Sequence, residues 1–436
     1  MEKIIKRIQA LKNTKNWGGC IIKKVALVIA TMTMVLLSQI THAELELHIS
    51  KTSNDGIPIY IANITGGANG IIEADLKRSG RFTIVNRSKI KNLSPFGGSI
   101  NAGTYQNIAD YIVRGQQSND GGLTIELIST SDNVNTRYTI SSNTNLRRVA
   151  HKAADSIYQK VTREKGAFDT RLSYVTVTNK ASSNRKFRLY VADSDGHNPQ
   201  VILTSQQPIM SPAWSPNGQE LAYVSFERDS SAVYVQNIFT GEKRLISARK
   251  GINGAPAWSP DGSRIALNLS INGNSEIYTI HAHNGTLTQV THSSSIDTEP
   301  VWSGTNSIIF TSDRGGSPQL YRIAATGGSA QRITFDGKYN SAADIANKKM
   351  AYITGNRGAF HVALRSVNGS GLDMLSNGRL DESPTLAPNG AMVAYTTLRN
   401  GENTLAVVSD NAKARQFLIS PAGDIREPAW SPYLTK

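Results

Sequence analysis

The sequence predicts an α/β N-terminal domain followed by an all-β six-bladed β-propeller, whose first blade is completed by the C-terminal strand. Three observations support this prediction. A short motif recurs down the C-terminal two-thirds, each interval has room for four short strands, and helix and strand patterns are mixed before the first interval. Four strands in about 40 to 45 residues is the repeat of a propeller blade.

The recurring motif is clearest at residues 257–267, which read Ala-Trp-Ser-Pro-Asp-Gly-Ser-Arg-Ile-Ala-Leu. Trp258 supplies a large apolar side chain to one strand, and the Ile-Ala-Leu segment forms the returning strand. The Pro-Asp-Gly between them suits a tight turn, because proline presets φ and glycine accepts a positive φ. Each copy therefore predicts a hairpin with one buried face. The copy at residues 345–349 lacks this turn, so its hairpin should be shorter.

The number of motifs predicts the number of blades. Equivalent positions recur every 41 to 44 residues, at Trp214, Trp258, Trp302, Ile345, Leu386 and Trp430. Residues 171–204 have the pattern of the later strands of a blade but no leading Trp strand. The strand at Trp430 should complete that blade, which gives a ring of six without open sheet edges. The tryptophans are expected to pack between blades.

Residues 1–43 have the pattern of a secretory signal, with cleavage predicted after Ala43. Lysines precede an uncharged run at residues 25–37, and Thr-His-Ala follows it. An uncleaved anchor is the alternative, but a membrane-spanning helix needs about 20 apolar residues. Cys20, the only cysteine, would leave with the signal, which excludes disulfides, zinc thiolate sites and cysteine nucleophiles. We therefore expect a periplasmic protein that does not span the membrane after cleavage.

The composition excludes one further class of function. The chain is 39% hydrophobic and 18% charged, which is typical of globular proteins. Its formal net charge is +14, and part of this excess lies in the predicted signal. No dense run of Lys and Arg with interleaved aromatic residues occurs, so nucleic-acid binding is not expected.

Residues 44–165 are predicted to form the α/β domain, and residues 166–436 the propeller. Alternating or continuous apolar runs indicate strands at 44–49, 57–61, 82–85, 112–113, 123–128 and 137–140. Apolar residues at helical spacing indicate helices at 70–78, 105–111 and 146–161. Strands mixed with helices are typical of an α/β unit.

The motifs resemble those of the TolB family of Tol-Pal systems. The resemblance rests on Ser-Pro-Ala-Trp-Ser-Pro-Asn-Gly at 211–218, Asn-Gly-Ala-Pro-Ala-Trp-Ser-Pro-Asp-Gly at 253–262 and Pro-Ala-Trp-Ser-Pro-Tyr-Leu at 428–434, and it covers essentially the whole chain. It implies a periplasmic adaptor, without enzymatic activity or a cofactor, that supports outer-membrane integrity and constriction during cell division. It implies binding to the peptidoglycan-associated lipoprotein Pal at a propeller mouth and to TolA through the N-terminus. Other outer-membrane proteins are further candidate partners.

The loops that enter the innermost strands should converge on one mouth of the channel. The candidate partner-binding residues there are Ile252, Asn253, Gly254, Ala255, Thr298, Glu299, Asp344, Asp381, Glu382, Arg426 and Glu427. The resemblance implies that residues 253–255 and 298–299 contact Pal. The alternative is that Pro, Glu and Thr in these loops only cap strands and satisfy backbone donors.

The segment before the first domain could act as a switch. Glu44, Leu45, Glu46, Leu47, His48 and Ile49 alternate in polarity, as in a strand that adds to a sheet edge. The resemblance implies that this segment either docks on the protein or is released to TolA, and that Pal biases the choice. The alternative is a simple first strand of the α/β domain.

Two other classes of function remain open. A propeller hydrolase would need a catalytic cluster, but no Gly-x-Ser-x-Gly motif occurs, and the histidines are scattered along the sequence. His281 and His283 share a strand face, which is more often a solvated edge than a metal site. A propeller that binds glycan or peptidoglycan is the main alternative to an adaptor, and direct binding of glycan fragments at the mouth would favour it.

Overall fold

The computed structural model describes residues 47–48, 56–142, 145–179, 184–356, 358–369, 371–418, 421 and 423–434. The described residues belong to one compact unit. The predicted export signal and Glu44, Leu45, Glu46 and Ile49 lie outside the described residues. Within the described ranges, no helix is both long and apolar enough to cross a membrane.

The N-terminal domain is built on a five-stranded mixed sheet with the order β3-β2-β4-β5-β6. The strands are β2 (Ile57–Ile61), β3 (Phe82–Ile84), β4 (Tyr111–Gln117), β5 (Leu123–Ser129) and β6 (Asn135–Ile140). β2 runs parallel to both β3 and β4, whereas β5 and β6 extend the sheet as an antiparallel hairpin.

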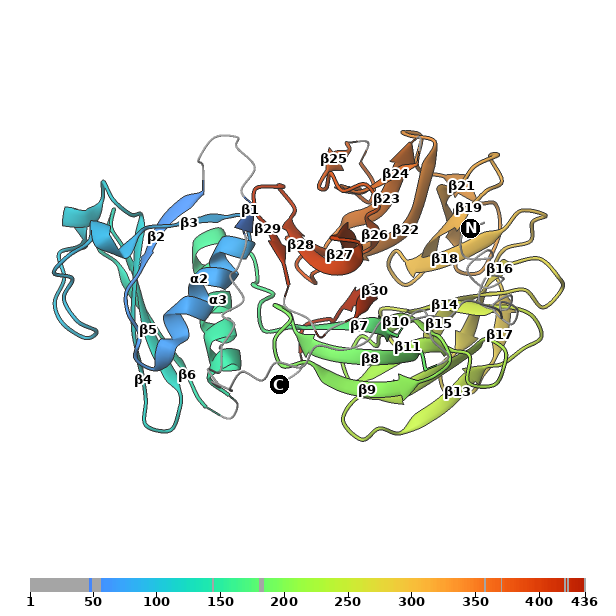
Figure 1. The fold of residues 1–436 in the computed structure, drawn as a ribbon. Helices are drawn as coiled ribbons and strands as arrows, with labels where there is room; N and C mark the ends of the chain where they lie inside the picture. Colours follow the sequence, from blue (N-terminus) through green and yellow to red (C-terminus); the bar gives the residue numbers. More distant parts are fainter. Residues whose placement is uncertain are drawn as a thin grey trace, which may run out of the picture. The chain divides into compact units, whose positions relative to one another are not determined.

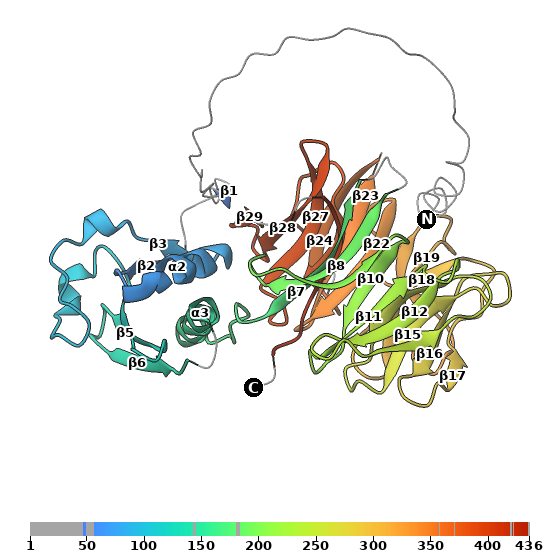
Figure 2. The same ribbon diagram turned by 60° about the horizontal axis from the view of Figure 1, so that its bottom comes forward.

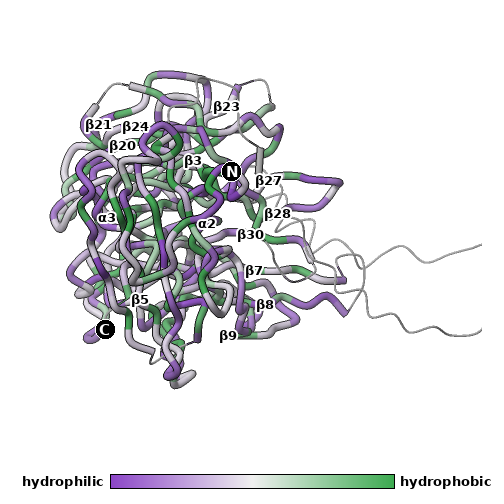
Figure 3. The backbone as a smooth tube through the Cα atoms, turned by 90° about the vertical axis from the view of Figure 1, so that its left-hand side faces the viewer, coloured by the Kyte–Doolittle hydropathy of each residue, from purple (hydrophilic) through white to green (hydrophobic). Residues whose placement is uncertain are grey.

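Two helices, α2 (Ala68–Arg78) and α3 (Leu146–Thr162), lie side by side against one face of this sheet (Figure 1). The buried residues of α3 recur at helical spacing, from Val149 to Tyr158. Asn145 caps its first turn by accepting a hydrogen bond from the Arg148 backbone N–H at 2.9 Å. Hydrophobic and hydrophilic residues alternate along the chain, as expected for elements with one buried face (Figure 3).

Residues 86–110 cover the opposite face of the sheet, and here one prediction was wrong. The expected helix at 105–111 is a short 3₁₀ helix, η3 (Ala102–Tyr105), followed by a turn, and β4 already begins at Tyr111. The Asp110 backbone N–H donates to the Pro58 carbonyl of β2 at 2.8 Å, which draws this residue into the sheet. Two further 3₁₀ helices, η1 (Thr65–Gly67) and η2 (Arg87–Lys89), connect the other elements.

The rest of the chain forms a six-bladed propeller of four-stranded antiparallel sheets, as predicted. Blade 1 contains β30 (Asp424–Trp430), β7 (Arg171–Thr178), β8 (Lys186–Asp193) and β9 (Gln200–Ser205). Its inner strand comes from the far end of the chain, and Trp430 pairs with Leu172. The predicted closure of the first blade by the C-terminal strand is therefore confirmed.

The other five blades follow in chain order, each from its inner to its outer strand. Blade 2 contains β10 (Ile209–Trp214), β11 (Glu220–Ser225), β12 (Ala232–Asn237) and β13 (Lys243–Ser247). Blade 3 contains β14 (Asn253–Trp258), β15 (Arg264–Leu269), β16 (Glu276–His281) and β17 (Leu287–Gln289). Blade 4 contains β18 (Asp297–Trp302), β19 (Ser307–Ser312), β20 (Gln319–Ala324) and β21 (Gln331–Arg332).

Blade 5 contains β22 (Tyr339–Ala346), β23 (Lys349–Asn356), β24 (Ala359–Ser366) and β25 (Asp373–Met374). Its first hairpin is shortened, as predicted. Ala346 pairs directly with Lys349, and the two turn residues have φ values of 46° and 64°. Blade 6 contains β26 (Glu382–Leu386), β27 (Met392–Arg399), β28 (Glu402–Ser409) and β29 (Arg415–Phe417). A fifth strand, β1 (Leu47–His48), pairs with β29 at the outer edge of this blade (Figure 2).

Three of the four tryptophans in the propeller connect neighbouring parts of the ring. The indole N–H groups of Trp214 and Trp302 each donate at 3.0 Å to a carbonyl on the inner strand of the preceding blade, that of Ala429 and Ala257 respectively. The indole of Trp430 donates to Thr170 Oγ1 at 2.8 Å, and the segment around Thr170 leads into β7. Trp258 is only half-buried, and its indole N–H has no partner among the described residues.

This difference predicts unequal effects of the same substitution. Trp430→Phe should lower the free energy of unfolding by about 1–2 kcal/mol more than Trp258→Phe, because only the first change breaks an indole hydrogen bond. Urea unfolding followed by circular dichroism measures both losses, and Trp258→Phe serves as the matched control. Equal losses would show that the bond to Thr170 contributes nothing.

Candidate functional site

A β-bulge interrupts the inner strand of every blade at the same position. Across the bulge, the pairing register advances by three residues on the inner strand and by two on its neighbour. The inner strand therefore has one extra residue without a pairing partner. The bulge residues have φ between 43° and 53°, although none is glycine; they are Ser211, Ala255, Glu299, Ala342, Ser383 and Glu427. A non-glycine residue in this region costs about 1–3 kcal/mol, and surrounding structure must hold it there. Six repeats of the same distortion form a ring around one end of the channel.

This end of the channel is the mouth predicted from the sequence. The inner strands begin here, so the turns between their first and second strands lie at the other end. Contacts with the N-terminal domain and the segment that follows it are made at that other end. Asn389, in the turn after β26, donates to the Lys165 carbonyl at 3.0 Å, and Arg81 pairs with Asp410, in the turn after β28, at 2.9 Å. The bulge ring therefore lies at the opposite end of the blades from these contacts.

Asn253 and Asp381 lie two residues before the bulges and are fully buried. The Asn253 side chain accepts from Ser247 Oγ at 2.6 Å and from the Arg249 N–H at 3.0 Å, and it donates to the Arg249 carbonyl at 2.7 Å. The Asp381 carboxylate accepts from Ser376 Oγ and from the Gly378 N–H. Both side chains hold the loop that enters their strand, so they shape the mouth from inside the protein.

Glu299 and Glu427 occupy the bulges themselves. Glu299 Oε2 accepts from Thr311 Oγ1 at 2.8 Å and from the Ala342 N–H at 3.0 Å, and Glu427 accepts from the Ser211 N–H. These hydrogen bonds fit the alternative role predicted for the loop residues, which is to satisfy backbone donors rather than to contact a partner.

Asp344 lies beyond the bulge of its strand and contacts the next blade. Its carboxylate accepts from Thr385 Oγ1 at 3.0 Å and from the Leu386 N–H at 2.7 Å. Burial raises the pKa of this carboxyl above its usual range, although these hydrogen bonds oppose the shift. Asp344 therefore joins blades 5 and 6 below the ring.

The remaining predicted residues line the mouth with partly accessible surface. Ile252 is 40% exposed, and the others are half-buried; they are Gly254, Ala255, Thr298, Glu382 and Arg426. Arg426 pairs with Asp424 at 2.7 Å. Two exposed apolar side chains on the same end were not predicted, Phe335 before β22 and Leu398 at the end of β27. An apolar residue within a polar turn, as in Thr-Phe-Asp-Gly at 334–337, could have indicated Phe335.

Comparison with known proteins decides the family. A family model described as the TolB beta propeller domain matches residues 158–434, and one described as the TolB amino-terminal domain matches residues 45–130. The chain belongs to the TolB family. It is 47% identical over 380 residues to the Tol-Pal system protein TolB of Xanthomonas oryzae pv. oryzae, a match that covers 84% of this chain and 86% of the relative. It is 46% identical over 379 residues to the protein of the same name from Xanthomonas campestris pv. campestris, with the same coverage.

A solved structure agrees with this assignment. The crystal structure of TolB from Acinetobacter baumannii is 36% identical and superposes with a TM-score of 0.81, covering 89% of this chain and 100% of the solved chain. The chain is thus a TolB-family component of the Tol-Pal system, and this membership agrees with the prediction that it is not an enzyme. The predicted resemblance and fold class are confirmed.

A buried ionic cluster lies where α2 and α3 of this TolB-family chain meet the turn after β8. His151 Nδ1 is 2.6 Å from Asp75 Oδ2, and His151 Nε2 is 3.5 Å from Asp195 Oδ2. These three residues could by their spacing hold a metal ion. However, Arg78 already pairs with Asp75 at 2.8 Å, and Arg147 contacts Asp195. Because guanidinium groups neutralise both carboxylates, the arrangement fits an ion network between domains better than a metal site.

The electrostatics of this cluster favour the protonated form of His151. Burial alone would lower its pKa, but the carboxylates of Asp75 and Asp195 outweigh this effect and raise it. Asp195 is shifted the other way, because hydrogen bonds and nearby positive charges, including His197 and Arg147, outweigh burial and lower its pKa. Sequence reasoning missed this cluster, because its members are far apart in the chain and carry no motif.

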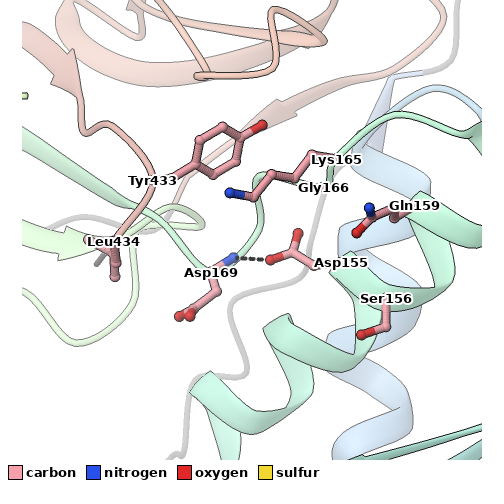
Figure 4. A pocket seen from close by; sticks show the side chains of 8 residues that line it. All are labelled: Asp155, Ser156, Gln159, Lys165, Gly166, Asp169, Tyr433 and Leu434. Atoms are coloured by element: carbon pink, nitrogen blue, oxygen red, sulfur yellow. Dashed lines mark hydrogen bonds between the residues drawn. The ribbon is translucent and has the colours of Figure 1, made fainter. Parts of the chain in front are cut away.

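A small pocket of about 150 Å³ lies beside the segment between the two domains (Figure 4). Asp155 of α3 accepts hydrogen bonds from the backbone N–H groups of Phe168 and Asp169 at 2.7 and 3.0 Å, and burial raises its pKa to about 7. A Cβ on Gly166 would approach Asp155 Oδ1 to 2.3 Å, so glycine is required there. Lys165 Nζ lies 3.6 Å from the ring centroid of Tyr433, which follows β30. The pocket therefore marks a joint between the domains.

The raised pKa of His151 predicts a pH-dependent contribution to stability. The folded state holds this proton more tightly, so the contribution is complete below pH 6.5 and is lost as pH rises through the folded-state pKa. His151→Asn should therefore lower the free energy of unfolding most at about pH 5 and progressively less towards about pH 9. Over this range the loss should shrink by about 1.4 kcal/mol for each unit by which folding raises the pKa.

Urea unfolding at a series of pH values measures the difference between wild type and His151→Asn. Asp155 also lowers the free energy of unfolding as pH rises, because its pKa is raised in the folded state. Taking the difference between wild type and variant at each pH removes this shared contribution. Exposed His292→Asn is the control and should show no such trend. A difference between wild type and His151→Asn that stays constant with pH would contradict the assignment.

Proposed function

We propose that the protein is a periplasmic adaptor that binds Pal at the mouth of the propeller and TolA through its N-terminal segment. In this role it supports outer-membrane integrity and constriction during cell division. The observation that carries the Pal proposal is the bulge ring, because residues 253–255 and 298–299 lie in it on the adjacent inner strands β14 and β18. The two loops expected to contact Pal thus share one surface.

The accessible side chains of the mouth favour a protein partner. Ile252 and Phe335 are 40% and 72% exposed at the loops that enter β14 and β22. Fully burying an apolar side chain of this size contributes about 1.5–3 kcal/mol, so such residues are effective anchors in an interface. The buried Asn253 and Asp381 hold the loops that enter β14 and β26 in place before a partner arrives, which lowers the entropic cost of binding.

The pairing of β1 with β29 supports the proposal for TolA. Leu47 lies opposite Gln416 and His48 opposite Arg415, in an antiparallel ladder of two residues. In this pairing β1 adds to a sheet edge of the propeller. It is not the first strand of the α/β sheet, which was the alternative prediction for this segment. A ladder this short contributes few hydrogen bonds, so a partner that binds the free segment could displace it.

The mouth can be tested with one apolar-to-acidic substitution. Ile252→Asp should weaken binding of purified Pal about tenfold or more, since it places a charge where an apolar contact is expected. Val201→Asp in β9, where the side chain is 50% exposed on an outer strand, is the matched control and should bind as wild type. Isothermal titration calorimetry measures both. Absence of binding to wild type, or binding of soluble peptidoglycan fragments in place of Pal, would contradict the adaptor proposal.

The N-terminal segment can be tested by deletion. Removing residues 44–51 should abolish TolA binding while leaving Pal binding measurable. Proline lacks a backbone N–H and disfavours strand pairing, so Leu47→Pro should weaken the pairing with β29 and strengthen TolA binding by favouring the free segment. Surface plasmon resonance with immobilised TolA measures both effects. Unchanged TolA affinity after the deletion would rule out this segment as the TolA site.

A further inference from the structure

We propose that Glu299 and Glu427 are positioning residues, which fix the geometry of the mouth by tying the bulge of one blade to the bulge of the next. This inference rests on the proposed Pal-binding role of the mouth and assigns the two glutamates a part in it that is distinct from partner contact.

The two glutamates occupy equivalent places on opposite sides of the ring. Glu299 is the bulge residue of blade 4 and Glu427 that of blade 1, with φ values of 53° and 51°. Blades 1 and 4 are three steps apart in a ring of six, since the inner strands contact one another in the order β30, β10, β14, β18, β22 and β26. The chain thus places a carboxylate at two diametrically opposed bulges.

Each carboxylate accepts a hydrogen bond from the same kind of donor, the backbone N–H of the next bulge. Glu299 Oε2 accepts from Ala342 at 3.0 Å, where φ is 52°, and Glu427 accepts from Ser211, where φ is 51°. Both acceptors therefore hold a strained residue of the neighbouring blade. The other bulge residues, Ser211, Ala255, Ala342 and Ser383, have side chains too short to span two blades in this way.

The contacts of Glu299 show how its position is fixed. Thr311 Oγ1 on the second strand of the same blade donates to Glu299 Oε2 at 2.8 Å and lies 3.3 Å from the Ala342 N–H. The same oxygen thus receives a hydroxyl from its own blade and an amide from the next. A carboxylate oxygen held in this way serves as an acceptor for the fold, and a direct ion pair with a partner is not required to explain its presence.

If the two glutamates act as positioning residues, the mouth needs their hydrogen-bond acceptor oxygens but not their negative charges. Glutamine keeps an acceptor oxygen and loses the charge, whereas alanine loses both. If the glutamates position the mouth, Glu299→Gln and Glu427→Gln should bind Pal within about threefold of wild type, and the alanine variants should bind about tenfold or more weakly. The two sites should behave alike, although they lie on opposite sides of the ring.

The experiment combines calorimetry with hydrogen exchange and needs no partner for its second part. Glu299→Ala should speed exchange of the Ala342 amide but not of Ser211, and Glu427→Ala should do the reverse. Glu242→Ala, an exposed turn residue at the other end of blade 2, is the control and should leave both amides and Pal binding unchanged.

The outcomes separate this inference from the proposed function. Should wild type fail to bind Pal, the adaptor proposal falls, while the exchange data still decide the positioning role. Glutamine variants that lose as much affinity as the alanine variants, or an Ala342 amide unaffected by Glu299→Ala, would overturn the inference. If an alanine variant does not fold, exchange in the glutamine variant decides instead, and protection at wild-type level is the supporting result.

Discussion

The pairing of β30 with β7 is the constraint on which the rest of the structure depends. It joins residues at the two ends of the propeller sequence and converts a row of blades into a ring. The same segment runs from Arg426 and Glu427 at the mouth to Trp430 and Tyr433, which contact Thr170 and Lys165 between the domains. One strand thus fixes the ring, contributes to the mouth and anchors the N-terminal domain.

Polar contacts across blade boundaries give the ring its defined geometry. Apolar clusters fill the space between neighbouring blades, but apolar contacts are non-directional and tolerate small shifts. Hydrogen bonds from the Trp302 indole to the Ala257 carbonyl, from the Leu386 N–H to Asp344 and from the Ala342 N–H to Glu299 fix the register of one blade against the next. The ionic cluster around His151 links the two domains in the same way, through directional contacts between buried charges.

Much of the fold could be predicted, because its repeats are local. Recurring turn chemistry and a tryptophan in four of the six motifs predicted the number of blades, their spacing and the closing strand. The helix expected at 105–111 was wrong, since the spacing of Tyr105, Ile108 and Ala109 suits a helix as well as a turn packed on a sheet. The bulges could not be predicted, because residues such as Ala255 and Glu299 carry no signature of a positive φ. Asp75, His151 and Asp195 meet only in the folded chain, so no spacing in the sequence indicates their cluster.

The late position of β30 in the sequence also affects how the protein folds. β30 follows blades 2 to 6 in the sequence, so β7 has no inner neighbour until Asp424–Trp430 reaches it. Contacts between such distant residues form slowly, since a long loop must close first. During this interval the open edge of β7 presents unpaired backbone groups to which a strand of another chain can add. A chain that lacked β30 would keep that edge open permanently and would be prone to aggregation.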